Sequence, residues 1–162
     1  LSGADVTIEY INGEQQVLLN GENVTPILRT EEVGNMASAS SVNGDVRAKM
    51  KELQQKLAAT TNVVMDGRDI GTVILPNAQV KVYLTASVEV RAERRYKELV
   101  EKGLEADLEK IKKDIEERDY RDMNRDIAPL RQAEDATLVD SSYLTIEESA
   151  AVIMNLIDKK MA

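Results

Sequence analysis

The sequence predicts an α/β fold in which a parallel sheet is covered by helices and preceded by a small antiparallel β meander. Two observations carry this prediction. Within the first 28 residues, alternating stretches are separated by Asn-Gly turns, which is typical of antiparallel hairpins. From residue 63 onward, short apolar segments alternate with long helical patterns, which favours parallel strands covered on both faces.

The meander is predicted within residues 5–28. Apolar and polar residues alternate from Val6 to Tyr10, which indicates a β-strand. Asn12-Gly13 and Asn20-Gly21 are both hairpin turn signals. Together they indicate short strands that fold back on one another.

Two helices are predicted next. Thr30 begins the first, and the carboxylates in its first turn oppose the helix dipole. The small and polar residues 36–44 are expected to interrupt it. The second helix has an apolar stripe with Arg47 at its margin, and the stripe consists of Val46, Met50, Leu53 and Leu57.

The parallel sheet and its helices are predicted in the remaining sequence. The expected strands are residues 63–65, 80–84 and 137–139. The expected helices are residues 87–102, residues 104–125 and a final helix that begins at Thr145. Thr145 and Glu148 form a capping box for that last helix, and Pro129 ends the segment before the third strand.

The helix predicted over residues 104–125 changes character along its inward face. Spacings of four and three place seven residues on one side of a continuous helix: Leu104, Leu108, Ile111, Ile115, Arg118, Asp122 and Arg125. The first four are apolar and the last three are charged, and burying an unpaired charge is unfavourable. This face therefore predicts a wall that leads into an anion-binding cleft. The alternative is that the helix kinks or ends near Arg118 and that the charges form an exposed, self-neutralising surface.

The composition limits the chemistry that the chain can perform. The 162 residues contain no Cys and no His, which excludes disulfides, thiolate nucleophiles, histidine acid–base catalysis and ordinary zinc sites. Catalysis would then rest on carboxylates, Arg, Lys, hydroxyls and a hard cation such as Mg²⁺. The net charge of −8 and the scarcity of aromatic residues argue against a nucleic-acid polymer as partner. No stretch is typical of a signal peptide or a membrane span, so no membrane partner is expected and a cytoplasmic location is favoured.

The loop at residues 66–72 follows the first predicted parallel strand, which is where ligands of such sheets bind. Asp66 could hold a metal-bound water, Arg68 offers a planar fork for phosphate, and Asp69 could accept hydrogen bonds from a sugar or an amine. The alternative is a glycine turn with a surface ion pair. None of the eight glycines begins a G-x-x-x-x-G-K-[ST] sequence, so these residues contain no Walker A loop.

Taken together, these segments resemble the bacterial cytidylate kinases over essentially the whole chain. The resemblance rests on the 66–72 loop, residues 118–130, residues 29–33, the spacing of Ser38 and Arg47, and the β meander. It implies a P-loop nucleoside-monophosphate-kinase-like parallel sheet with a nucleotide-binding β insert and a helical lid. By this resemblance residues 1–44 form the insert and residues 45–162 a partial core, with the lid at about residues 91–125.

The resemblance also implies an activity, because family members transfer a phosphoryl group from ATP to CMP or dCMP with Mg²⁺. The residues that would bind the acceptor nucleotide are Ser38, Arg47 and Asp69 for the cytosine, Arg118 and Asp122 for the pentose, and Arg68 and Arg125 for the phosphate. Catalysis would rest on Arg68, Arg118 and Arg125. The lid candidates for the ATP phosphates are Arg94, Arg95 and Arg121, with a solvated helix face as the alternative, and Asp66 would hold Mg²⁺ through water.

The chain departs from the family pattern at its beginning. In the family, two strands and the Walker A loop precede the position that matches Leu1. We therefore expect an incomplete sheet and no kinase activity from these residues alone, with association to an N-terminal segment or self-association completing the fold. The alternatives are a kinase for another nucleoside monophosphate, a non-catalytic nucleotide-binding or interaction module, and an adapter whose charges are merely on its surface.

Overall fold

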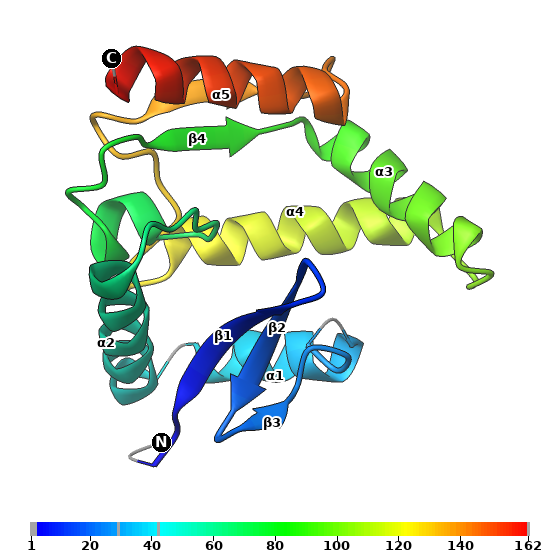
Figure 1. The fold of residues 1–162 in the computed structure, drawn as a ribbon. Coiled ribbons are helices and arrows are strands. Elements are labelled where there is room, and N and C mark those ends of the chain that lie inside the picture. Colours follow the sequence, from blue (N-terminus) through cyan, green and yellow to red (C-terminus); the bar gives the residue numbers. More distant parts are fainter. Residues whose placement is uncertain (1–2, 29, 42, 162) are drawn as a thin grey trace. The chain divides into compact units, whose positions relative to one another are not determined.

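The alternating residues at the start of the chain form the predicted meander in a computed structural model that describes residues 3–28, 30–41 and 43–161. Its strands are β1 (Val6–Ile11), β2 (Glu14–Leu19) and β3 (Glu22–Asn23), paired in the order β1-β2-β3 (Figure 1). Both Asn-Gly turns have positive φ at both residues, 55° and 83° at Asn12 and Gly13 and 52° and 85° at Asn20 and Gly21. Such pairs suit the twist of two-residue hairpins, so these turns set the register of the meander.

Two helices follow, α1 (Glu31–Ser40) and α2 (Gly44–Thr60). The Thr30 hydroxyl accepts a hydrogen bond from the Val33 amide at 3.4 Å, which confirms the predicted helix start. The interruption predicted from residue 36 is wrong, because α1 continues to its end at Ser40. Small residues are compatible with a helix, and the break occurs only where the Asn43 side chain caps the first amides of α2.

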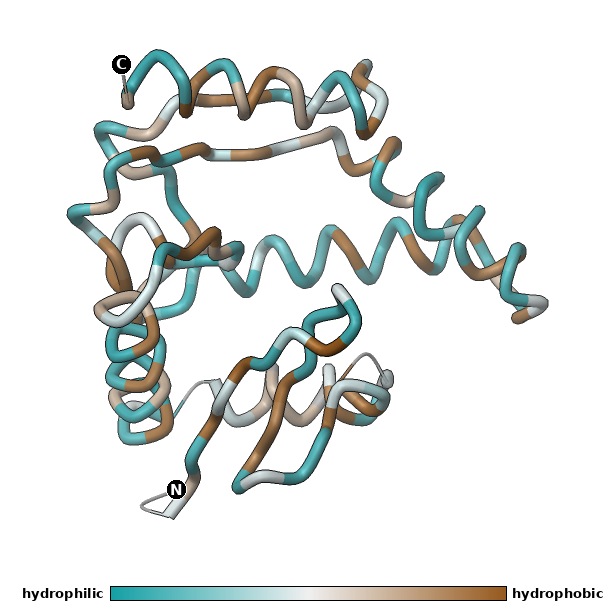
Figure 2. Tube along the Cα trace, in the orientation of Figure 1, coloured by the Kyte–Doolittle hydropathy of each residue, from teal (hydrophilic) through white to brown (hydrophobic). Residues whose placement is uncertain are grey.

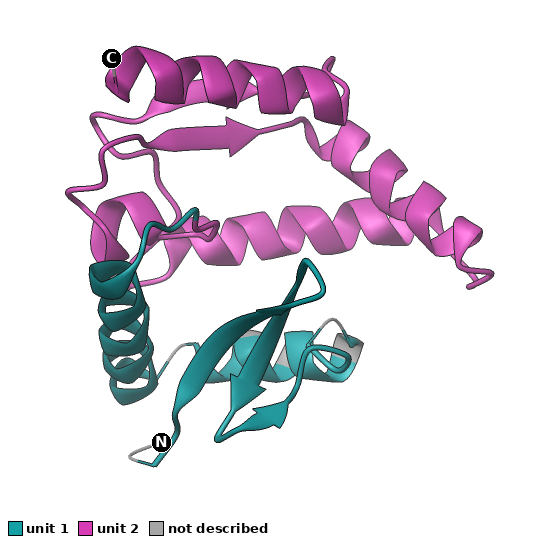
Figure 3. Cartoon of the chain, in the orientation of Figure 1, with its two compact units in different colours: residues 1–64 teal, residues 65–162 magenta. Residues whose placement is uncertain are grey.

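The meander, α1 and α2 belong to the first of two compact units, residues 1–64, and the rest of the chain forms the second, residues 65–162 (Figure 3). α2 therefore clusters with the meander. The predicted boundary at residue 44, between a nucleotide-binding insert and a partial core, stays a prediction.

The second unit is the mixed α/β part of the chain, as predicted. Its elements are a π-helical turn η1 (Ile70–Ile74), β4 (Val82–Thr85), α3 (Val88–Glu101), α4 (Leu108–Asn124), β5 (Thr137–Asp140) and α5 (Ile146–Met161). β4 and β5 pair in parallel from Val82 opposite Thr137 to Thr85 opposite Asp140. The buried apolar residues of this unit are Ile74, Ala86, Ala92 and Val139.

The strand predicted at residues 63–65 is not formed. Residues 62–66 have no regular secondary structure, and Val64 is 97% exposed. An extended segment becomes a strand only where a neighbouring backbone completes its hydrogen bonds. Over the described residues, β4 has β5 as its partner and residues 63–65 pair with neither strand.

The helix α4 is shorter than the predicted 104–125 segment at both ends. Asp107 caps it by accepting a hydrogen bond from the Lys110 amide at 3.0 Å, so Leu104 lies outside the helix, after the left-handed Gly103. Arg125 has an extended backbone and ends the helix. The alternative of an end near Arg118 is also wrong, since the helix continues to Asn124. Figure 2 shows α4 as largely hydrophilic with separated apolar positions.

The final helix begins as predicted. The Thr145 amide donates to Glu148 at 2.8 Å and the Glu148 amide donates to the Thr145 hydroxyl at 3.1 Å, which completes the capping box of α5. No helix in the described part of the chain combines the length and the apolar character that crossing a membrane requires.

Candidate anion site on α4

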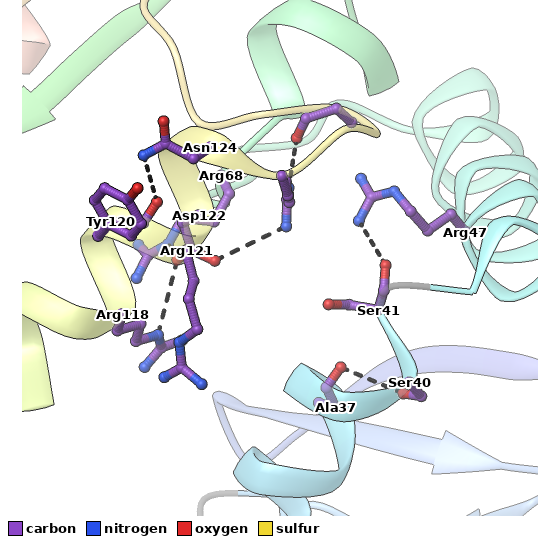
Figure 4. Close-up of polar contacts among 12 residues, drawn as sticks. Ala37, Ser40, Ser41, Arg47, Arg68, Arg118, Tyr120, Arg121, Asp122 and Asn124 are labelled. Carbon is purple, nitrogen blue, oxygen red and sulfur yellow. Dashed lines mark hydrogen bonds and ion pairs between the residues drawn. The ribbon is translucent and has the colours of Figure 1, made fainter.

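Three arginines lie around the carboxylate of Asp122 near the end of α4. The Arg68 Nε donates to Asp122 Oδ2 at 2.7 Å, although the two residues are 54 positions apart in the sequence. Arg118 Nε lies 3.9 Å from the same oxygen and Arg125 Nη1 lies 4.0 Å from Oδ1. Figure 4 shows Arg68, Asp122 and Arg118 close together at the end of α4. The structure thus brings together all four residues of the second unit that were predicted to contact the pentose and phosphate.

The members of this cluster, Arg68, Arg118, Asp122 and Arg125, differ in burial. The side chains of Asp122 and Arg125 are 19% and 16% exposed, whereas Arg118 is 63% exposed. The Arg125 Nη2 is buried and has no hydrogen-bond partner. A buried donor without a partner is unfavourable, so an acceptor that reached this atom would stabilise it.

The chain turns sharply after α4 to hold Arg125. Arg125 Nε donates to the Ala128 carbonyl at 2.7 Å, and the Leu130 amide donates to the Asp122 carbonyl at 2.8 Å. Ala128 has a φ of 50°, a left-handed conformation that costs roughly 1–2 kcal/mol in a residue other than glycine. Such local strain is common at functional sites, where the surrounding contacts enforce it.

The 66–72 loop presents Arg68 to this cluster. A methyl group added at Gly67 would lie 2.9 Å from Ile70 Cγ1, so the close approach of loop and side chain favours glycine there. Asp69 caps η1, and its carbonyl accepts hydrogen bonds from the Val73 amide at 2.9 Å and the Ile74 amide at 3.2 Å. The predicted turn is therefore a π-helical one that fixes the backbone just after Arg68.

The charge of the cluster suits a phosphate ester. Three guanidiniums around one carboxylate give a local charge of about +2, and a phosphate monoester carries about −1.5 to −2 at neutral pH. Guanidiniums bind phosphate oxygens in a planar, bidentate manner. The alternative of an exposed and self-neutralised surface fits Arg68 and Arg118, which are 42% and 63% exposed, but it does not fit the less exposed Asp122 and Arg125.

Two residues predicted to read the cytosine belong to the first unit. Arg47 is half-buried on α2, and its Nη1 donates to the Ser41 carbonyl at 3.4 Å (Figure 4). Ser38 lies within α1, but its side chain is outside the described residues, and so is Arg29 of the 29–33 segment. Both roles stay predictions.

The three lid candidates are held by contacts within the second unit. Arg94 Nη2 donates to the Ser141 carbonyl at 2.6 Å and to the Leu144 carbonyl at 3.3 Å, which ties α3 to the segment after β5. Arg95 pairs with Glu98 on the exposed face of α3, and Arg121 Nε donates to the Glu117 carbonyl at 3.3 Å. None of these contacts brings a lid candidate to the Asp122 carboxylate in the described part of the chain.

Two ion pairs between α3 and α4 escaped the sequence analysis. Arg91 Nη2 donates to Asp119 Oδ2 at 2.6 Å, and Lys112 Nζ lies 3.0 Å from Glu89 Oε1. A hydrogen bond from its own backbone amide, followed by one from Lys112, lowers the pKa of Glu89, and the same pair raises the pKa of Lys112. The spacing of Asp119 and Asp122 on one helix face was the available signal for a second carboxylate–arginine contact.

Metal binding was predicted only for Asp66, through water. Asp66 is exposed. Among the described residues, no group of three or more carboxylates could enclose a metal ion. Mg²⁺ in phosphate sites takes one or two carboxylates together with waters and substrate oxygens, and one exposed carboxylate is compatible with that manner of binding.

An α/β fold with arginines gathered around one carboxylate is typical of proteins that bind a phosphorylated ligand. The family model of cytidylate kinase matches residues 3–159. The cytidylate kinase of Ligilactobacillus salivarius is 49% identical over 158 residues, which cover 96% of this chain and 70% of that protein. Those of Enterococcus faecalis and Caldicellulosiruptor saccharolyticus are 49% and 47% identical, over 96% and 98% of this chain and 69% and 70% of their own lengths. The chain therefore belongs to the cytidylate kinase family, and the predicted resemblance is confirmed.

Proposed function

We propose that this chain supplies the acceptor-nucleotide site of an ATP-dependent kinase that converts CMP and dCMP to CDP and dCDP in the cytoplasm. The observation that carries the proposal is the contact of Arg68 with Asp122, with Arg118 and Arg125 within 4.0 Å of the same carboxylate. The family membership supports CMP as the acceptor.

In this proposal Arg68 and Arg125 bind the CMP phosphate, and Arg118 with Asp122 binds the pentose. The unpartnered Arg125 Nη2 supports a role in phosphate binding, because a phosphate oxygen would satisfy it. Phosphoryl transfer depends mainly on positioning and on neutralising the charge of the transferring oxygens. Arginines can perform both tasks, which agrees with a chain that contains neither His nor Cys.

Selectivity for cytosine is assigned to Ser38, Arg47 and Asp69. Buried polar groups that match one base reject another, because the wrong base leaves them unpaired. We propose that residues 1–44 act as the nucleotide-binding insert, and that residues 91–125, with α3 and α4, act as the lid.

The donor side of the site requires more than these residues. ATP would bind with Mg²⁺, which would shield the phosphates, and Asp66 would hold a metal-bound water. The sequence contains no Walker A loop. We therefore expect the chain by itself to bind CMP without transferring a phosphoryl group, until a segment with a Walker A loop joins it.

The second candidate is a non-catalytic nucleotide-binding module. Supplying a segment that contains G-x-x-x-x-G-K-[ST] separates the two functions. Phosphoryl transfer from ATP to CMP by the completed protein would exclude the non-catalytic module.

Calorimetric titration of the chain with CMP, and with UMP and AMP at equal concentrations, tests the proposal. We expect CMP to bind more tightly than UMP or AMP, and the variant Arg68→Ala to lose at least tenfold in affinity, since a charge-assisted contact to phosphate contributes ~1.5 kcal/mol or more. Arg95→Ala is the matched control, because Arg95 pairs with Glu98 on an exposed helix face. Equal binding of all three nucleotides, or an unchanged affinity in Arg68→Ala, would contradict the proposal.

A further inference from the structure

Two carboxylates on consecutive turns of α4 are each paired with an arginine from a different element. Asp119 pairs with Arg91 of α3 at 2.6 Å, and Asp122 pairs with Arg68 at 2.7 Å. Each carboxylate is only 19% exposed. Residues three apart on a helix lie side by side, so both pairs act on the same short stretch of α4.

The same Arg91 guanidinium also contacts the residue that directly follows β4. Its Nε donates to the Ala86 carbonyl at 2.9 Å, and Ala86 directly follows β4. Ala86 is 7% exposed and Ala92, next to Arg91, is 1% exposed. One guanidinium therefore connects the buried end of β4 to α4, and its planar fork gives both contacts a fixed direction.

We propose that Arg91, acting through Asp119, is a positioning residue for the anion site: it sets the place of the α4 segment that presents Arg118 and Asp122. This inference rests on the proposed function, in which those residues bind CMP. Because Arg91 and Asp119 neutralise each other, the pair holds the helix without changing the charge that the ligand meets.

A second ion pair between the same helices provides a matched control. Lys112 and Glu89 lie 3.0 Å apart and join α3 to the N-terminal half of α4. Glu89→Gln weakens that contact between the helices. The contact reaches α4 at Lys112, which precedes the segment that carries the anion site. A general loosening of the helix pair would affect both variants alike.

The first measurement is amide hydrogen exchange of the free chain. In Asp119→Asn we expect the amides of residues 118–124 to exchange about tenfold faster, since the segment loses its link to the sheet, while Glu89→Gln leaves them unchanged. Unchanged exchange of residues 118–124 in Asp119→Asn, or equal acceleration in Glu89→Gln, would overturn the inference. Asp119→Glu, which retains the charge and shifts the contact by one methylene, gives the same comparison with a smaller effect if Asp119→Asn fails to fold.

The second measurement is calorimetric titration with CMP. We expect the Kd of Asp119→Asn to rise about fivefold, because misplaced charge-assisted hydrogen bonds lose strength, and the Kd of Glu89→Gln to stay unchanged. Faster exchange with an unchanged Kd would reduce Arg91 to a purely structural role and overturn the inference. Failure of the proposed function is a separate outcome. In that case Arg68→Ala would bind CMP with the same Kd as the parent chain, and this result does not depend on the hydrogen-exchange rates of residues 118–124.

Discussion

Replacing Arg125 with Met should weaken nucleotide binding while leaving the stability of the unliganded chain almost unchanged. Met preserves the apolar stem and removes a buried Nη2 that has no partner, which recovers ~1–3 kcal/mol. It also removes the 2.7 Å bond to the Ala128 carbonyl, which contributes ~1.5–3 kcal/mol for a charged donor. The ion pair with Asp122, at 4.0 Å, adds little. These opposing terms cancel to within ~1–2 kcal/mol.

The loss in binding should be much larger than the change in stability. A charged hydrogen bond to phosphate contributes ~1.5–3 kcal/mol, so the Kd for CMP should rise by about 10- to 150-fold. Urea unfolding gives the first quantity and calorimetric titration gives the second. Arg95→Met is the control for binding, since the Arg95 side chain is 52% exposed and pairs with Glu98, and it should leave the Kd unchanged. A fall of more than ~3 kcal/mol in the free energy of unfolding of Arg125→Met, or a Kd within twofold of the parent, would refute the reasoning.

Three further outcomes are expected. Asp122→Asn leaves three guanidiniums without their counterion and should lower the free energy of unfolding by up to ~1 kcal/mol at low salt. Urea titrations should show a smaller loss at high salt, and an effect independent of salt would contradict this. The hydrogen bond from Lys102 is the main cause that lowers the pKa of Glu98 from 4.5 to about 2, so its stabilisation is present above pH 4.5 and is lost as the pH falls to about 2. Thermal midpoints of Glu98→Gln and the parent chain should therefore differ near neutral pH and converge near pH 2, and a constant difference would exclude this origin. Lys81 is 7% exposed and its hydrogen bond lowers the pKa of Asp135, so Lys81→Met should bring that pKa, followed by NMR titration, back toward 3.8; an unchanged pKa would mean that another group lowers it.

Local signals in the sequence predicted most of the secondary structure. The Asn-Gly turns, the Thr30 cap and the Thr145 capping box depend on neighbours within a few residues, and each is found where it was expected. Such motifs are encoded by the residues that form them. They could therefore be predicted without knowledge of the tertiary contacts.

The errors arose where an element depends on distant partners or on competing caps. Residues 63–65 have the composition of a strand but pair with no neighbour among the described residues, and Val64 remains exposed. Periodicity extended α4 to Leu104 and Arg125, whereas the Asp107 cap and the turn at Ala128 determine its actual ends. Spacing describes a helix face, but it does not locate where the helix stops.

The four charged residues that the structure brings together could be singled out from the sequence, whereas their pairing could not. Arg68, Arg118, Asp122 and Arg125 were chosen by charge, by spacing and by resemblance to the family. That Arg68 takes the short bond to Asp122, and that Arg125 is the most buried arginine of the set, follows from contacts across the fold. The link from Arg91 to Asp119 also joins separate elements, so the spacing that places Asp119 beside Asp122 signalled a second carboxylate but did not identify its partner.

The charges around α4 explain how the site can form before its ligand arrives. Three guanidiniums close together repel one another, and the Asp122 carboxylate offsets part of that repulsion by accepting from Arg68 and lying near the other two. A fully neutral cluster would attract phosphate weakly, whereas a cluster of about +2 both folds and matches the charge of a phosphate monoester. An additional anchor for α4 must therefore be neutral overall, and the pairing of Arg91 with Asp119 satisfies that condition. In the proposed function, Asp122 holds Arg68 in place before CMP binds, and preorganised charges of this kind favour phosphoryl transfer.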